Sequence, residues 1–182
     1  MTAGNAVDAI AVIDTSGSMA DPAAGGGNKM AAAIQAGKLF VNLIPPDLGN
    51  RVGATRFSTD ATTFLPIQEV TAANQAAKVD TIKDPPLAPS GWTAIAAGIM
   101  TAIPEFAVPH AGATPANLTK AIVVMTDGKD NTAFKNPAYG KYYSLGTSAQ
   151  DPANTSNVIP TLSFVPRSSR IQETRFNPVR ST

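Results

Sequence analysis

One short segment of the chain carries the residue types of a cation site. Asp14, Ser16 and Ser18 lie within five residues, directly after the apolar run 7–13. Such a run is typical of a strand that is buried on both faces inside a parallel sheet. The turn after it brings one carboxylate and two hydroxyls to the carboxyl edge of the sheet, where open α/β sheets bind ligands. Three hard oxygen donors suit Mg²⁺. The same residues also occur in ordinary turns and helix caps, so this segment alone leaves both interpretations open.

Two further segments have side chains of the same kind. Thr93 comes just before the helix-like stretch 94–100, and Asp127 follows a second apolar run, 121–125. Taken singly, Thr93 is explained by a helix N-cap and Asp127 by a turn before Gly128. All three segments lie at the end of a strand or loop in a βα pattern. Separate local explanations for each of them are therefore much weaker than one shared site.

The five residues together resemble the metal-ion-dependent adhesion site of von Willebrand factor type A (vWA) domains, also called integrin I-like domains. They are Asp14, Ser16, Ser18, Thr93 and Asp127. The resemblance covers about residues 6–132 and rests on matches in three separate segments. It implies a Rossmann-like α/β fold, with a doubly wound, mostly parallel sheet flanked by helices.

The resemblance also implies a role for each residue. Ser16 and Ser18 would bind Mg²⁺, or Mn²⁺ in its place, through their hydroxyls, and Thr93 would be a third ligand, directly or through water. Asp14 and Asp127 would act mostly through coordinated water and by orienting the hydroxyls. A dication held by neutral hydroxyls keeps its affinity for one more anionic oxygen, which a Glu or Asp of a partner protein can supply. We therefore expect a metal-dependent protein-binding module, not an enzyme.

Strands and helices alternate along the segments that position these residues. We expect helices over 29–44, 71–82 and 94–106, and strands over 51–57, 62–67 and 120–126. Thr71 is expected to cap the second helix, and Pro104 to kink or end the third. The strand 62–67 is expected at an antiparallel edge. This order predicts a largely parallel, doubly wound sheet.

The C-terminal part departs from this pattern. Residues 133–157 have the composition of an irregular loop, and Pro160 interrupts the strand-like residues that follow. Residues 166–182 carry four arginines and one glutamate without any period, which is typical of disorder or loose packing. We therefore divide the chain into a metal-site core, 1–132, and an atypical segment, 133–182. The final strand and helix of the fold look incomplete there, through truncation, excision or a reading-frame error.

Composition excludes several classes of protein. The 182 residues suffice for one domain, and the absence of cysteine excludes disulfides and thiolate metal sites. A net charge of +1 argues against nucleic acid as the main partner. We expect no membrane span, because no run approaches the ~20 apolar residues of a membrane helix. Without a leader before the first strand, we expect a cytoplasmic chain, or an extracellular or periplasmic one if it is an excised fragment.

Two other functions remain as alternatives. The first is a Mg²⁺-dependent hydrolase, but no general base stands out, and His110 is expected at the surface of a Pro/Gly/Ala loop. The second is an assembly subunit of an ATPase-linked complex, with the nucleotide site on another chain. The glycines before Lys29 lack the Gly-Lys-Ser/Thr of a phosphate loop. Trp92, beside Thr93, either shapes the rim of the site for a partner or packs over its loop.

Overall fold

The computed structural model describes residues 6–111 and 117–128, together with the backbone of four short strands further along the chain. Its main elements are strand β1 (Ala6–Asp14), helix α1 (Lys29–Leu43), strands β2 (Arg51–Phe57) and β3 (Ala61–Glu69), helices α2 (Gln75–Thr81) and α3 (Ile95–Ala102), and strand β4 (Leu118–Met125). Two 3₁₀ helices, η1 (Gly17–Ala20) and η2 (Ile103–Ala107), follow β1 and α3. Among the described helices, none has the length and hydrophobicity that crossing a bilayer requires.

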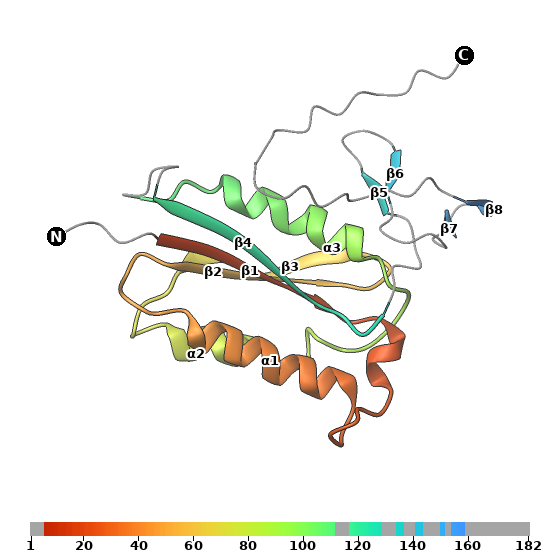
Figure 1. Cartoon of the computed structure of the whole chain (residues 1–182), viewed down its shortest axis with the longest axis horizontal. Coiled ribbons are helices and arrows are strands. Elements are labelled where there is room, and N and C mark those ends of the chain that lie inside the picture. Colours follow the sequence, from red (N-terminus) through yellow and green to blue (C-terminus); the bar gives the residue numbers. More distant parts are fainter. Residues whose placement is uncertain are drawn as a thin grey trace, which may run out of the picture.

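Strand β1 lies inside a four-stranded sheet of order β3-β2-β1-β4 (Figure 1). It runs parallel to both β2 and β4, and β3 pairs antiparallel with β2 at one edge. The registers place Asp14 opposite Phe57 of β2, and Ile13 opposite Met125 of β4. The three parallel strands therefore end at the same edge of the sheet. This confirms the expected α/β fold with a mostly parallel sheet, and it confirms the antiparallel edge strand.

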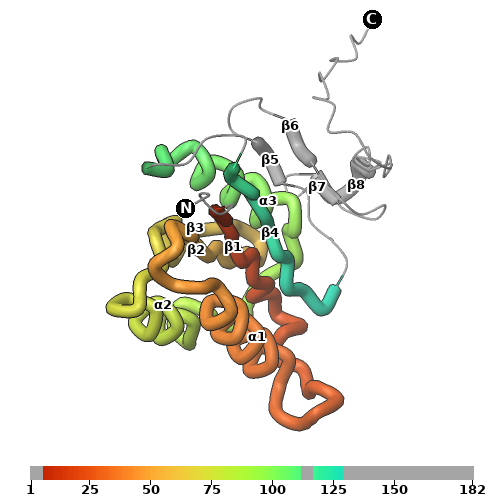
Figure 2. The backbone as a smooth tube through the Cα atoms, turned by 60° about the vertical axis from the view of Figure 1, so that its left-hand side comes forward, coloured from red at the N-terminus to blue at the C-terminus, as the bar shows by residue number. Residues whose placement is uncertain are grey.

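Helices cover both faces of the sheet. Helices α1 and α2 lie against one face and α3 against the other (Figures 1 and 2). Helix α1 begins at Lys29, as predicted, because the side chain of Asn28 caps it by accepting a hydrogen bond from the Ala31 backbone N–H at 2.8 Å. Two prolines, Pro45 and Pro46, follow its last turn. With strands on both sides and helices on both faces, β1 is buried along nearly its whole length.

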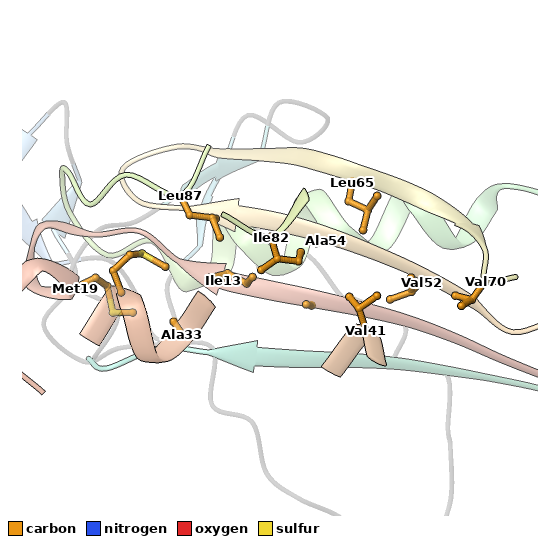
Figure 3. Packing of buried hydrophobic residues seen from close by; sticks show 12 residues of the cluster. Ile13, Met19, Ala33, Val41, Val52, Ala54, Leu65, Val70, Ile82 and Leu87 are labelled. Atoms are coloured by element: carbon orange, nitrogen blue, oxygen red, sulfur yellow. The ribbon is translucent and has the colours of Figure 1, made fainter. Parts of the chain in front are cut away.

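The core has one part on each face of the sheet. On the α1 and α2 side it includes Ile13, Val41 and Ile82, which belong to one cluster of buried side chains along the strands (Figure 3). On the α3 side the buried residues of the described part include Ile10, Val12, Phe57, Ile67 and Ala102. Neighbouring residues of β1 thus serve opposite faces, which explains why its apolar residues run without interruption.

Two glycines allow the helices to lie close to the sheet. A Cβ atom at Gly98 of α3 would lie 2.7 Å from both Phe57 Cδ1 and Val12 Cγ1. A Cβ atom at Gly37 of α1 would lie 2.9 Å from Ile82 Cγ2 and 3.2 Å from Ile13 Cδ1. Both positions therefore require a residue without a side chain for the present spacing.

Two helix boundaries are informative. Helix α2 begins at Gln75, so the predicted cap at Thr71 was wrong. The side chain of Asn74 accepts a hydrogen bond from the Thr71 backbone N–H at 3.0 Å and donates to Glu69 O at 3.1 Å, which forms a turn before the helix. Helix α3 ends at Ala102 and continues as η2, which contains Pro104. Pro104 ends the α-helix, as predicted, because it lacks a backbone N–H.

A buried ion pair joins β1 and β2 at the opposite, amino end of the sheet. Asp8 is fully buried, and Arg51 donates to its two oxygens from Nε at 2.8 Å and from Nη2 at 2.6 Å. Burial alone raises the pKa of Asp8, but the hydrogen bond and charge of Arg51, with a smaller contribution from His110, bring it below the ordinary value. His110 Nδ1 lies 3.0 Å from Asp8 Oδ1, and its side chain is only 8% exposed. The expected surface histidine was therefore wrong.

The structure also describes four short strands beyond residue 133. They are β5 (Phe134–Asn136), β6 (Lys141–Tyr143), β7 (Gln150–Asp151) and β8 (Asn154–Val158). They pair antiparallel as two separate ribbons, β5 with β6 and β7 with β8. Composition predicted an irregular loop for most of this segment. Pro160 and residues 166–182 lie outside the described residues, so the predictions about them stay predictions.

Candidate metal centre

The turn after β1 places Asp14, Ser16 and Ser18 at the carboxyl edge of the sheet. Asp14 is the last residue of β1, and its Oδ1 accepts a hydrogen bond from the Ser16 backbone N–H at 2.7 Å. The backbone N–H and the hydroxyl of Thr15 both donate to Phe57 O, at 2.7 and 2.9 Å. Contacts with the neighbouring strand and the Asp14 carboxylate therefore fix the shape of the turn.

Side-chain oxygens from the ends of β1 and β4 and from the residues just after them meet in this turn. Ser16 Oγ lies 3.1 Å from Ser18 Oγ, and Ser18 Oγ donates to Asp127 Oδ1 at 3.0 Å. Asp14 faces the end of β4 with its second oxygen, Oδ2, which accepts a hydrogen bond from Thr126 Oγ1 at 2.6 Å. Residues that are more than a hundred positions apart in the sequence thus lie side by side, because β1 and β4 are parallel neighbours.

The loop that carries Thr93 is fastened to the same turn. The Ser90 backbone N–H donates to Thr15 O at 2.7 Å, and the Gly17 backbone N–H donates to Gly91 O at 2.9 Å. Gly91 has a φ of 74°, and a Cβ atom there would lie 2.6 Å from Thr59 Oγ1, so this position requires glycine. Thr93 itself is buried, two residues after this contact.

Trp92 lies beside Thr93 and points largely into solvent. Its side chain leaves the residue 61% exposed, while its backbone N–H donates to Thr59 Oγ1 at 3.1 Å. Of the two alternatives for Trp92, packing over the loop is therefore the poorer description. An exposed indole stands next to the site.

Lys29 is a residue of this site that the sequence did not predict. Its Nζ donates to Asp127 Oδ2 at 2.6 Å and to Asp21 Oδ2 at 3.5 Å. The hydrogen bond to Asp127 raises the pKa of Lys29 above its ordinary value. A usable signal existed, because a cation in the first turn of a helix is disfavoured by the helix dipole and indicates a carboxylate nearby. Thr126 was also missed, and its signal is a hydroxyl residue directly before Asp127.

Asp127 is held at both of its oxygens. Oδ1 accepts a hydrogen bond from Ser18, and Oδ2 accepts one from Lys29. Burial alone raises the pKa of Asp127, but these hydrogen bonds and the charge of Lys29 outweigh it and bring the pKa below the ordinary value. The carboxylate is therefore ionised and fixed in orientation at neutral pH.

An apolar hollow of about 300 Å³ lies beside the oxygen cluster. Met19 of η1, Ala33 of α1 and Met125 of β4 contribute to its lining, together with Lys29 and Asp127. The site thus has a charged part and an apolar part next to each other.

The donor set fits a small, hard cation. The described part of the chain contains no group of three His, Cys, Asp or Glu residues that could hold a metal ion, so a cation here depends on hydroxyls. Two ligands on adjacent corners of a Mg²⁺ octahedron are about 3 Å apart. Ser18 Oγ lies 3.1 Å from Ser16 Oγ and 3.0 Å from Asp127 Oδ1, which are hydrogen-bond distances and are compatible with that spacing. An all-oxygen set suits Mg²⁺ or Mn²⁺.

Known proteins share this fold. The family model of the von Willebrand factor type A domain matches residues 8–151. No curated protein sequence matches the chain significantly. The PilB minor pilin from Streptococcus sanguinis superposes with a TM-score of 0.60 at 24% identity, over 76% of this chain and 33% of PilB. The vWF domain of the type V pili tip protein Mfa5 from Porphyromonas gingivalis gives a TM-score of 0.52 at 23% identity, over 73% and 42% of the two chains.

A third similar structure is proximal thread matrix protein 1 from the mussel byssus, with a TM-score of 0.53 at 20% identity, over 70% of this chain and 30% of that protein. At such identities the likeness shows a shared fold. The chain spans about a third of the length of PilB. The family match, in contrast, covers most of the chain and agrees with the observed sheet and helices. The chain belongs to the von Willebrand factor type A domain family.

Proposed function

We propose that this vWA domain is a metal-dependent protein-binding module. It holds Mg²⁺ at the carboxyl edge of the sheet and binds, through the metal, an acidic side chain of a partner protein. The observation that carries the proposal is the row of side-chain oxygens from Ser16, Ser18 and Asp127, which come from two distant segments and lie at spacings that a small hard cation could bridge.

The residues around this row have separate tasks. Ser16 and Ser18 supply neutral hydroxyl oxygens, and Thr93 supplies a third from its fastened loop. Asp14 orients the turn, because its two oxygens accept hydrogen bonds from the Ser16 backbone and from Thr126. A cation bound mainly by neutral oxygens retains much of its positive charge, so it attracts an external carboxylate.

The surroundings of the site support a protein as the partner. Trp92 is exposed beside Thr93, and tryptophan is enriched among residues that dominate protein interfaces. The apolar hollow offers room for an apolar side chain next to the carboxylate that reaches the metal. Two of the structurally similar proteins are a minor pilin and a pilus tip protein, which favours an adhesive role over membership in an ATPase-linked complex.

We propose a binding role without catalysis. The single histidine of the chain, His110, lies at the amino end of the sheet and is engaged by Asp8, so it cannot serve as a base at the carboxyl edge. Turnover of a generic phosphoester that requires Ser18 would contradict this part of the proposal.

Metal binding is tested by thermal unfolding with and without Mg²⁺ or Mn²⁺. A cation at ten times its dissociation constant stabilises the folded state by about 1.4 kcal/mol, or roughly 3–6 °C for a chain of this size. We expect this shift in the wild type, its loss in Ser18→Ala, and its retention in Thr62→Ala, which removes an exposed hydroxyl from β3. A wild type that shows no shift, or a shift that Ser18→Ala retains, would refute the metal site.

Partner recognition is tested with a library of displayed peptides, selected in Mg²⁺ and eluted with EDTA. We expect enriched peptides to share a Glu or Asp and to lose binding to the Ser18→Ala domain. Trp92→Ala is expected to weaken the same peptides while leaving the Mg²⁺-dependent shift in Tm unchanged. Peptides that bind equally well in EDTA, or that lack an acidic residue, would contradict the proposed mode of recognition.

A further inference from the structure

We propose that Lys29 sets the divalent-cation affinity of the site, as a fixed positive charge that competes with the cation for Asp127. The proposal rests on the proposed function and adds a residue that weakens metal binding. A weaker metal site is filled only at higher divalent-ion concentrations, so Lys29 would make partner binding depend on that concentration.

The first observation is the contact itself. Lys29 Nζ lies 2.6 Å from Asp127 Oδ2, while the other oxygen of the same carboxylate accepts from Ser18. The side chain of Asp127 is only 13% exposed, and that of Lys29 is 33% exposed. The ammonium is therefore held against the oxygen row by an ion pair that is itself partly exposed.

The second observation is the place of Lys29 in its helix. It is the first residue of α1, where the partial positive charge of the helix terminus disfavours a cation, and the first turn contains no acidic residue. Local helix energetics thus oppose a lysine here. Its carboxylate partners come from outside the helix, and the nearer of them belongs to the candidate metal centre.

The third observation is a second carboxylate within reach. Asp21 Oδ2 lies 3.5 Å from Lys29 Nζ, and Asp21 is kept there because the Lys29 backbone N–H donates to Asp21 O at 3.0 Å. The loop between them is closed further by a bridge from Pro22 to Asn28. Asp21 can therefore pair with the ammonium when a cation engages Asp127, so that Lys29 shifts partners without leaving the site.

The physical consequence is a lower affinity for dications. A unit charge close to a dication changes the binding constant by roughly tenfold, even with the dielectric constant of water. Lys29 repels the cation, and it also stabilises the Asp127 carboxylate in the absence of one. Both effects act in the same direction.

The test is calorimetric titration of the whole chain with MgCl₂ and, separately, MnCl₂. We expect Lys29→Gln to bind both cations about tenfold more tightly than the wild type. Lys29→Arg keeps the charge and is expected to stay within about threefold of the wild type. Lys83→Gln removes one positive charge from the ion pair with Asp80 and is expected to bind as the wild type does, which controls for net charge.

A second pair of variants tests the exchange of partners. We expect Asp21→Asn to weaken cation binding in the wild-type background more than in the Lys29→Gln background, because only the former still has an ammonium to transfer. If Lys29→Gln perturbs folding, Asp21→Asn in the wild-type background still tests the exchange by itself, since Asp21 is exposed and its replacement alters no buried contact.

The outcomes separate this inference from the proposed function. If the wild type and Ser18→Ala alike show no cation binding, the metal-dependent function itself fails. If the wild type binds Mg²⁺ and Lys29→Gln binds it equally or more weakly, the function stands and the role of Lys29 is overturned. If Lys83→Gln binds the cations as much more tightly as Lys29→Gln does, the effect comes from net charge, and the role of Lys29 is overturned as well.

Discussion

Replacement of Gly98 by alanine tests how closely helix α3 rests on the sheet. The added methyl group would lie 2.7 Å from an atom of the Phe57 ring and 2.7 Å from a methyl group of Val12. Both neighbours are fully buried in central strands of the sheet. Val12 is β-branched and has few alternative rotamers, so neither neighbour can move aside without shifting a strand or the helix.

The magnitude follows from two opposing effects. Alanine in place of glycine inside a helix contributes about 1 kcal/mol of stability through helix propensity. Overpacking a close-packed core costs about 1–3 kcal/mol, and two contacts this short favour the upper end. We therefore expect Gly98→Ala to lose about 2 kcal/mol, which corresponds to a decrease in Tm of roughly 4–8 °C.

Gly37→Ala in helix α1 is the matched control. It has the same gain in helix propensity, but its methyl group would meet Ile82 Cγ2 at 2.9 Å and the terminal Cδ1 of Ile13 at 3.2 Å. These contacts are longer, and the Ile13 atom can rotate away, so we expect a smaller loss than for Gly98→Ala. The assay is urea unfolding of both variants beside the wild type. A Gly98→Ala variant as stable as the wild type, or more stable than Gly37→Ala, would refute this account of the packing.

The remaining predictions concern the ion pair at the amino end of the sheet and the cap of α1. Arg51→Met leaves Asp8 buried without its main partner, and we expect a loss of about 3–5 kcal/mol in urea unfolding; a loss below about 1 kcal/mol would contradict this. Because the folded-state pKa of Asp8 is lowered, its contribution is complete above the ordinary Asp pKa and is lost as the pH falls through the lowered value. Tm should therefore fall more steeply on acidification in the wild type than in Asp8→Asn, and parallel curves would refute the assignment. Asn28→Ala should cost about 1 kcal/mol by removing the hydrogen bond to the Ala31 N–H, whereas Asn28→Asp should keep most of it; equal losses would argue against the cap.

The regular elements were predictable because each leaves a local pattern in the sequence. The unbroken apolar run of β1 indicates a strand covered on both faces, and the apolar periodicity after Lys29 indicates a helix with one buried face. Pro45 and Pro46 indicated where α1 ends, and Pro104 indicated where α3 ends. Proline lacks the backbone N–H that a helix requires. The start of α2 was not predictable, because Thr71 and Asn74 compete for the same turn and the Asn74 side chain prevails.

The site was predictable only in part, because part of it depends on contacts between distant segments. The places of Asp14 and Asp127 follow from the strands that precede them, once those strands are taken to be parallel neighbours. The roles of Lys29 and His110 depend on contacts that no local pattern encodes. Lys29 meets a carboxylate 98 residues away, and the pairing of His110 with Asp8 spans 102 residues.

The loop that carries Thr93 is fastened to the turn after β1 by main-chain hydrogen bonds, from Ser90 to Thr15 and from Gly17 to Gly91. Main-chain groups are the same in every amino acid, so this attachment is insensitive to the side chain at position 92. The indole at that position projects into solvent and takes no part in holding the loop. A substitution at position 92 is therefore expected to change the surface beside Thr93 while the main-chain attachment of the loop stays in place.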